Sequence, residues 1–134
     1  MTESLTPAGP IPDDDSQFFW DGLRDGKVLV QRCESCERFR FPPMPYCPFC
    51  RSSDMSVRPI SGRGSVYSWI VANRAFAPEF AADVPYIIAT IDFDEGVRAA
   101  LRVDGSPEMD FGLRVRSTIR DHGDWSELRV EADA

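Results

Sequence analysis

Apolar and polar residues alternate over much of the second half of the chain, a pattern typical of strands with one buried face. The alternation is clearest in SVYSWIVANRAF, residues 65–76, which places Val66, Ile70 and Ala72 on one face. Further β-like runs, with turn sequences between them, cover residues 85–94, 97–103, 113–121 and 125–132. Five short strands predict a small antiparallel barrel of the OB-fold type over residues 61–134. Periodicity leaves a five-stranded β-sandwich open as the alternative.

The first 26 residues have a different pattern. Residues 1–15 hold three prolines, three consecutive aspartates and few large apolar groups, so we expect a flexible arm. Residues 16–26 predict a short helix, with Ser16 as its N-cap and Gly26 as its end.

Three adjacent aromatic residues, Phe18, Phe19 and Trp20, lie in this predicted helix. Because they cannot all face one small core, at least one is a candidate for contact with a partner protein. The alternative is that the helix simply packs on its own domain.

All the cysteines lie between the helix and the barrel, in CESCERFRFPPMPYCPFC, as two C-x-x-C pairs: Cys33, Cys36, Cys47 and Cys50. Each pair can form a tight turn, and two facing turns supply the four thiolates of one tetrahedral zinc ion. Iron with the same four ligands is the alternative. Residues 27–60 are therefore predicted to form a zinc ribbon, in which residues 27–33 and 37–43 pair as a hairpin.

Four thiolates leave the metal no open position for water or substrate, so we expect a structural and not a catalytic site. Replacing Cys33 or Cys47 with serine should then unfold residues 27–58. The sequence contains none of the motifs G-x-S-x-G, H-E-x-x-H or a glycine-rich phosphate loop. The single histidine, His122, is expected in a solvated turn, and Asp92 and Asp94 at the solvated end of a hairpin. No enzyme site is predicted.

Charge is unevenly distributed along the chain, whose net charge is −7. Residues 27–63 carry seven basic and three acidic side chains, so the cysteine segment is basic and the remainder is strongly acidic. The acidic strands argue against the competing function of single-stranded nucleic-acid binding, in which Tyr67, Trp69 and Phe76 would stack on bases. The longest apolar runs are too short to span a bilayer. The N-terminus has no secretory pattern, so a cytoplasmic location without membrane contact is expected.

Five motifs follow one another along the chain: QFFWDGLRDGKVLVQRC, FPPMPYCPFC, GSVYSWIVANRAF, PYIIATIDFDEGVRAALRV and GLRVR. This series resembles a family of small proteins long catalogued as a domain of unknown function. Its members have an N-terminal helix, a rubredoxin-like zinc ribbon and a C-terminal OB-fold. The resemblance covers nearly the whole chain after the first fifteen residues.

The resemblance implies that the chain accompanies thiolases or related thiolase-fold enzymes of acyl-CoA metabolism, including aldolases that shorten steroid side chains. Other members of the family pair with hydratases of the hot-dog fold. In such assemblies the family member supplies no catalytic residue, holds subunits together and helps to shape the acyl-CoA path. On this basis the helix aromatics are the candidate anchors for the partner. The candidate contacts for the CoA phosphates are Arg38, Arg40, Arg58 and Arg63.

Two features depart from the family pattern. Family ribbons usually have glycine just after each C-x-x-C, whereas this chain has Glu37 and Arg51. A left-handed backbone at a non-glycine residue costs about 1 kcal/mol or somewhat more, so weaker metal binding is expected. The chain also stops soon after the fifth predicted strand, from which a loosely closed barrel is expected.

Overall fold

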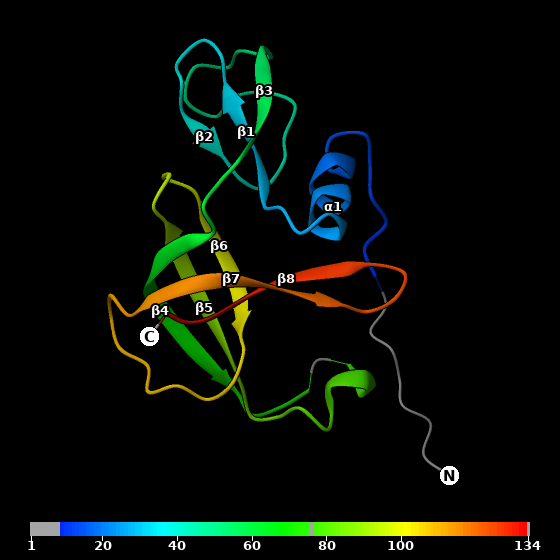
Figure 1. Cartoon of the computed structure of the whole chain (residues 1–134), viewed down its shortest axis with the longest axis vertical. Coiled ribbons are helices and arrows are strands. Elements are labelled where there is room, and N and C mark those ends of the chain that lie inside the picture. The colour runs from blue at the N-terminus through cyan, green and yellow to red at the C-terminus, as the bar shows by residue number, and fades with distance from the viewer. Residues whose placement is uncertain (1–8, 76, 134) are drawn as a thin grey trace.

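The computed structural model describes residues 9–75 and 77–133 and is mainly β, with the ribbon at one end and the barrel at the other (Figure 1). The predicted arm lies partly, and Phe76 entirely, outside the described residues. The elements are α1 (Gln17–Arg24), β1 (Leu29–Cys33), β2 (Phe39–Arg40), β3 (Met55–Pro59), β4 (Arg63–Ala72), the 3₁₀-helix η1 (Pro78–Phe80), β5 (Tyr86–Phe93), β6 (Arg98–Val103), β7 (Arg114–Asp121) and β8 (Ser126–Ala132). Neither helix has the length and apolar character that a membrane span requires.

The turn before α1 begins earlier than the sequence predicts. The Asp13 carboxylate accepts a hydrogen bond from the Ser16 N–H at 2.8 Å, and the Ser16 hydroxyl accepts one from the Asp13 N–H at 3.1 Å. This reciprocal pair has the form of a capping box. The hydrogen bonds from Ser16 lower the pKa of Asp13. Ser16 stands at the predicted N-cap position, but its side chain makes no capping hydrogen bond to α1 and instead binds the Asp13 N–H before the helix.

The ribbon is a three-stranded antiparallel sheet in the order β2–β1–β3. The predicted hairpin is present, with Gln31 opposite Arg40 and Arg32 opposite Phe39. Strand β3, which pairs with β1 along its full length, was not predicted. Its sequence, MSVRP, is short, half polar and ends in proline, so it carries no clear strand signal.

The barrel is closed in the order β4–β5–β6–β8–β7. This confirms the OB-fold expectation and shows that the β-sandwich alternative is wrong. Most neighbouring strands are antiparallel, and β6 meets β8 in parallel through the single pair Val103 and Val130. Strands β6 and β8 are therefore joined by fewer residue pairs than the other neighbouring strands of the barrel.

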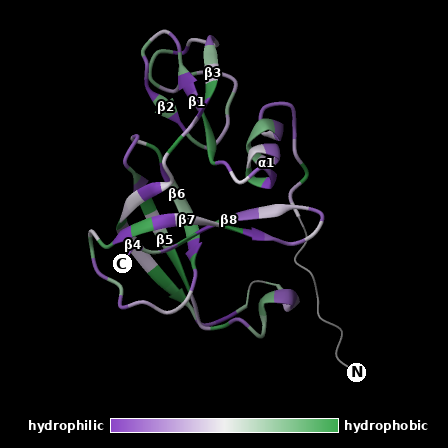
Figure 2. Cartoon of the chain, viewed as in Figure 1, coloured by the Kyte–Doolittle hydropathy of each residue, from purple (hydrophilic) through white to green (hydrophobic). Residues whose placement is uncertain are grey.

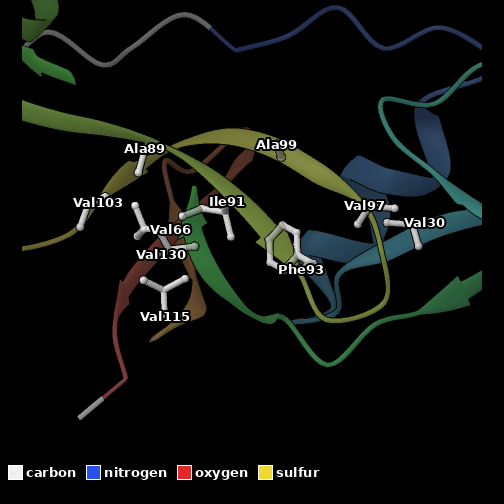
Figure 3. Packing of buried hydrophobic residues seen from close by; sticks show 10 residues of the cluster. All are labelled: Val30, Val66, Ala89, Ile91, Phe93, Val97, Ala99, Val103, Val115 and Val130. Atoms are coloured by element: carbon white, nitrogen blue, oxygen red, sulfur yellow. The ribbon is translucent and has the colours of Figure 1, made fainter. Parts of the chain in front are cut away.

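The barrel interior holds the larger of two apolar cores (Figure 3). Its members are mostly alternate residues of the barrel strands, such as Ile91 and Val115, both fully buried. Val30 of β1 also belongs to this core and is 2% exposed, so the base of the ribbon packs on the barrel. A second core joins Phe19 and Leu23 of α1 to Leu128 of β8. The helix thereby covers the barrel on the side of β8.

Strand β4 departs from the predicted alternation at Tyr67. The register with β5 shifts between Val66 and Ser68, which marks a β-bulge. Val66 and Ala72 are buried as predicted, but Ile70 is 58% exposed and Val71 49% exposed. The prediction that Ile70 shares a face with Val66 and Ala72 is therefore wrong, because the extra residue of the bulge interrupts the alternation of the strand.

Candidate metal centre

The four cysteine sulfur atoms meet at the tip of the ribbon. The Cys33 and Cys50 Sγ atoms lie 3.5 Å apart, the Cys36 and Cys47 Sγ atoms lie 3.6 Å apart, and all four lie within 4.8 Å of one another. A tetrahedral zinc ion with Zn–S bonds of about 2.3 Å requires sulfur atoms about 3.8 Å apart. The cysteines form no disulfide and fit such an ion.

Two turns of the same geometry carry the sulfurs. The Cys33 carbonyl accepts a hydrogen bond from the Glu37 N–H, and the Cys47 carbonyl accepts one from the Arg51 N–H, both at 2.9 Å. Glu37 and Arg51 have φ values of 66° and 67°. These are the positions where the family has glycine, and both side chains stand on a left-handed backbone. The strain expected from the sequence is thus present at equivalent places in both turns.

Backbone N–H groups point at two of the sulfurs and favour the thiolate form. The Cys36 N–H lies 3.5 Å from the Cys33 Sγ and lowers the pKa of Cys33. Burial alone would raise the pKa of Cys47, but hydrogen bonds from the N–H groups of Cys50 and Phe49 outweigh it and lower this pKa to about 6. Metal ligation needs deprotonated cysteines, so these N–H groups prepare the site for a cation.

The Gln31 side chain connects β2 and the Met44 loop inside the ribbon through hydrogen bonds. The sequence did not predict this role. The Gln31 side chain is 1% exposed, and its Oε1 accepts hydrogen bonds from the Arg40 Nε at 3.0 Å and the Met44 N–H at 2.8 Å. A single glutamine in a short strand gives no signal of this role. Arg40, one of the four CoA candidates, is 3% exposed and also donates to the Met44 carbonyl. It therefore lies inside the ribbon.

The other three candidate arginines are exposed and lie on different elements. Arg38 follows the first cysteine turn, and its guanidinium carbon lies 4.5 Å from the centre of the Phe49 ring. Arg58 is on β3 and Arg63 on β4, with side chains 53% and 59% exposed. Their carboxylate neighbours stand 3.9 and 3.4 Å away, so both keep hydrogen-bonding capacity for a ligand.

The aromatic residues of α1 pack largely on their own domain. Phe19 is 5% exposed and belongs to the second core, against which Phe18 and Trp20 pack while half-buried. Phe19 meets the Trp20 ring at 5.0 Å and the Phe41 ring at 5.3 Å between centroids. Only the exposed parts of Phe18 and Trp20 are left to contact a partner, which remains a prediction.

His122 is not in a solvated turn, and that expectation was wrong. Its side chain is 7% exposed, its ring stacks on Trp125 at 4.5 Å, and its Nε2 lies 2.7 Å from the Glu127 carboxylate. The β7–β8 hairpin places the Trp125 ring against the His122 ring. The sequence HGD of residues 122–124 does not predict this contact.

The two aspartates expected at a hairpin end lie there and are bound to arginines. Asp92 and Arg98 approach to 2.6 Å, and Asp94 and Arg114 to 2.8 Å. The hydrogen bonds from Arg114 lower the pKa of Asp94. Each carboxylate therefore forms an ion pair with an arginine of a barrel strand.

The sequence matches two domain families in succession. Residues 20–56 match the rubredoxin-like zinc ribbon domain of ChsH2, and residues 57–120 match the C-terminal OB-fold domain of ChsH2. A solved structure described as Ltp2-ChsH2(DUF35) aldolase contains a similar chain. It has a TM-score of 0.83 and 28% identity, and the match covers 92% of this chain and 98% of the other.

Three curated relatives differ in how much of their length is matched. A DUF35 domain-containing scaffold protein of Methanocaldococcus jannaschii is 32% identical over 75% of this chain and 74% of its own. The benzoylsuccinyl-CoA thiolase subunit BbsA of Thauera aromatica is 31% identical over 80% of this chain and 77% of its own. The 3-oxo-4,17-pregnadiene-20-carboxyl-CoA hydratase alpha subunit of Mycobacterium tuberculosis is 33% identical over 92% of this chain but only 40% of its own.

This chain thus spans less than half the length of the hydratase alpha subunits that it matches, 30% in one case and 40% in the other. The scaffold protein and the thiolase subunit are instead matched over about three quarters of their length. The two domains follow one another in the order ribbon and OB-fold, and the fold agrees with the similar chain of the Ltp2-ChsH2(DUF35) aldolase structure. The chain therefore belongs to the DUF35 family, in the ChsH2 form that joins a rubredoxin-like zinc ribbon to a C-terminal OB-fold.

Proposed function

We propose that this chain is a non-catalytic subunit that binds and stabilises a thiolase-fold acyl-CoA enzyme, either a thiolase or an aldolase, in lipid or steroid metabolism. The observation that carries the proposal is its likeness, over nearly the whole chain, to the DUF35 chain of the Ltp2-ChsH2(DUF35) aldolase. The relative named as a thiolase subunit supports the same class of partner.

The chemistry of the described residues supports a role without catalysis. Four sulfurs within 4.8 Å of one another complete the ligand set of a single ion and leave no position for a substrate. The carboxylates of Asp92 and Asp94 are bound to arginines, and His122 is bound to Glu127 under Trp125.

The metal in this proposal is one structural zinc ion, held by Cys33, Cys36, Cys47 and Cys50. Iron fits the same sulfur geometry, so elemental analysis of the purified chain separates the two metals. We expect one zinc per chain and a colourless protein. A coloured protein that contains iron would contradict the assignment. A site of four free thiolates also suits the reducing cytoplasm, where we place the protein.

In this proposal the CoA phosphates are contacted by the exposed Arg38, Arg58 and Arg63. Arg40 would act indirectly, by holding the loop at Met44. In the complex, replacing Arg58 and Arg63 with glutamine should raise KM for acyl-CoA with little change in kcat, whereas replacing Arg74 in the same way should change neither. Unchanged KM in the double variant would exclude Arg58 and Arg63 as contacts of the CoA phosphates.

The function is tested by expressing the tagged chain in its source cells and identifying what elutes with it in size-exclusion chromatography. We expect a thiolase-fold acyl-CoA enzyme in a fixed ratio, whose activity falls when this chain is absent, and no acyl-CoA turnover by this chain alone. A chain that elutes alone as a monomer, or that turns over acyl-CoA by itself, would contradict the proposal.

A hydratase of the hot-dog fold is the second candidate partner. Its support is the match to hydratase alpha subunits, one of which covers 92% of this chain. The same purification decides between the two, because mass spectrometry of the bound protein distinguishes a hydratase from a thiolase-fold enzyme.

A further inference from the structure

Strand β4 has an open edge along its second half. It pairs with β5 as far as Ala72, but its pairing with β7 on the other side covers only Arg63 to Ser65. Beyond these pairs, the Val66 N–H and carbonyl bind the loop that enters β7. From Tyr67 to Ala72 no strand of the described residues lies on that side. The outward N–H and carbonyl groups of this edge are therefore available to another chain.

Apolar side chains accompany this open edge. The bulge at Tyr67 leaves Tyr67, Ile70 and Val71 all about half exposed, and the neighbouring Phe111, 73% exposed, lies against the Trp69 ring at 5.1 Å. Figure 2 shows hydrophobic colour on the end of β4 farthest from the ribbon. No charged residue or proline occurs between Tyr67 and Ala72. We call Tyr67–Ala72 with Phe111 the β4 edge.

The longer of the two edge strands of the ribbon, β3, is protected. It carries Arg58, ends in Pro59, and its Ser56 hydroxyl binds Glu34. Charges and proline are the usual means by which proteins prevent pairing at an exposed strand. The β4 edge has neither, although it exposes more apolar surface. This difference between two open edges of one chain indicates that pairing is permitted at β4.

We propose that the β4 edge binds an extended segment of the partner subunit by β-strand addition. The inference rests on the proposed function for the existence of that partner. The backbone groups of the edge select a strand and not a helix, and the uncharged, exposed Ile70 and Val71 select uncharged, largely apolar side chains on it. The Tyr67 ring carries the Arg98 guanidinium 4.0 Å from its centre.

The size of the edge favours a strand of a larger partner over a second copy of this chain. Six residues span about 20 Å, and a strip one strand spacing wide covers on the order of 100 Å² before side chains are added. A stable protein interface needs about 800 Å² from each partner. Two β4 edges alone are too small for a dimer, whereas a partner that also contacts other surfaces can supply the missing area.

Amide hydrogen exchange tests the proposal on the complex captured with the tagged chain from its source cells. Exchange within residues 67–72 should slow by about tenfold or more relative to the free chain, because an edge amide gains protection when a partner carbonyl accepts its proton. Residues 55–59 of β3 provide the internal comparison and should change less. Unchanged exchange at the β4 edge in the complex overturns the inference while the proposed function stands.

Two variants complete the test. Ile70→Lys places a charge on the β4 edge, and the matched control Val57→Lys places one on the exposed face of β3. We expect Ile70→Lys to weaken the complex by about tenfold or more and Val57→Lys to have little effect. Equal effects of the two variants overturn the inference. If Ile70→Lys does not fold, the smaller change Ile70→Ser replaces it.

The remaining outcomes are also decisive. A chain captured alone overturns both proposals, because the edge then has no occupant in the cell. A partner that is not an acyl-CoA enzyme but protects residues 67–72 overturns the proposed function and supports the edge. Amide exchange at the β4 edge could instead slow in the free chain as its concentration rises. That result would assign the edge to a second copy of this chain and overturn the proposal of a partner segment.

Discussion

The ribbon and the barrel are both antiparallel β-structures, but they enclose very different amounts of apolar surface. The barrel surrounds a core of interlocking side chains, among them Ile91 and Val115 with no exposed area. At the tip of the ribbon the buried residues are Cys33 and Cys47. Below the tip, Val30 reaches into the barrel core. The base of the ribbon is thus buried against the barrel, whereas its tip needs a metal ion. A segment this short cannot form its own hydrophobic core.

This difference predicts which change destabilises the ribbon and which destabilises the barrel. Removal of the metal should disorder the tip of the ribbon and leave the barrel folded. Loss of a core side chain should destabilise the barrel and leave the metal bound. The following changes test the two halves of this comparison, from the largest expected effect to the smallest.

Cys47→Ser should have the largest effect. The variant loses one of four ligands, and structural zinc sites contribute about 10–16 kcal/mol of apparent binding energy in small zinc-finger peptides. We expect loss of stoichiometric metal and disorder of the ribbon tip, residues 33–55, while circular dichroism still reports the barrel. This segment is shorter than the residues 27–58 expected from the sequence, because Val30 is buried in the barrel core. Ser35→Ala, which removes a hydroxyl bound to Ser52 at the same tip, is the control and should keep its metal. Full metal content in Cys47→Ser would refute the ligand assignment.

Ile91→Ala tests the opposite half. The side chain is fully buried in the barrel, so its truncation should lower the free energy of unfolding by about 2–5 kcal/mol. Denaturant unfolding measures the loss, and the metal content should not change. Ile70→Ala, at an exposed site of the same barrel, should cost much less. If the two alanine variants are equally stable, the barrel core is not where the structure places it.

Arg51→Gly should strengthen the ribbon. Arg51 has a φ of 67°, and glycine adopts this conformation without the roughly 1 kcal/mol cost of a side chain. The variant should hold its metal against a higher concentration of a competing chelator. Arg51→Ala removes the same charge but keeps the Cβ atom, so it should show no such gain. An equal gain in both variants would assign the effect to charge and not to backbone strain.

Asp94→Asn should have the smallest effect, a small loss of stability at neutral pH that disappears in acid. Arg114 holds the pKa of Asp94 below its ordinary value of 3.8, so the carboxylate stabilises the folded state fully above that pH. The stabilisation disappears as the pH falls through the lower, folded-state pKa. The free energy of unfolding of the variant should therefore change less as the pH falls in acid. Circular dichroism of the barrel, which does not depend on the metal, measures this change. Asp124→Asn in the β7–β8 turn is the control, and an identical acid profile for both variants would argue against the Arg114 pairing.

Much of this architecture follows from local sequence. The C-x-x-C spacing predicts the two turns, and the alternating runs predict the five barrel strands, because both depend on residues close together in the chain. The positive φ of Glu37 and Arg51 was also foreseen, from the positions where related ribbons have glycine. Here the family pattern reports a backbone requirement that the residues themselves do not reveal.

The sequence does not predict features that depend on distant contacts. The burial of Phe19 needs Leu128 of the last strand, and the burial of His122 needs the ring of Trp125. Arg40 was expected at the surface as a basic residue, but Gln31 holds it inside the ribbon. The bulge at Tyr67 interrupts the alternation of β4, and Ile70 beyond it is exposed although Val66 and Ala72 are buried. In each case the deciding partner lies on another element.

The comparison between ribbon and barrel is tested most directly by a ¹H–¹⁵N correlation spectrum of the chain before and after the metal is removed with a chelator. We predict that the signals of the ribbon tip, residues 33–55, collapse toward random-coil positions, while those of β4 to β8 keep their dispersion. Restoring zinc should return the original spectrum. Loss of the barrel signals together with those of the ribbon, or no change in either, would contradict the account.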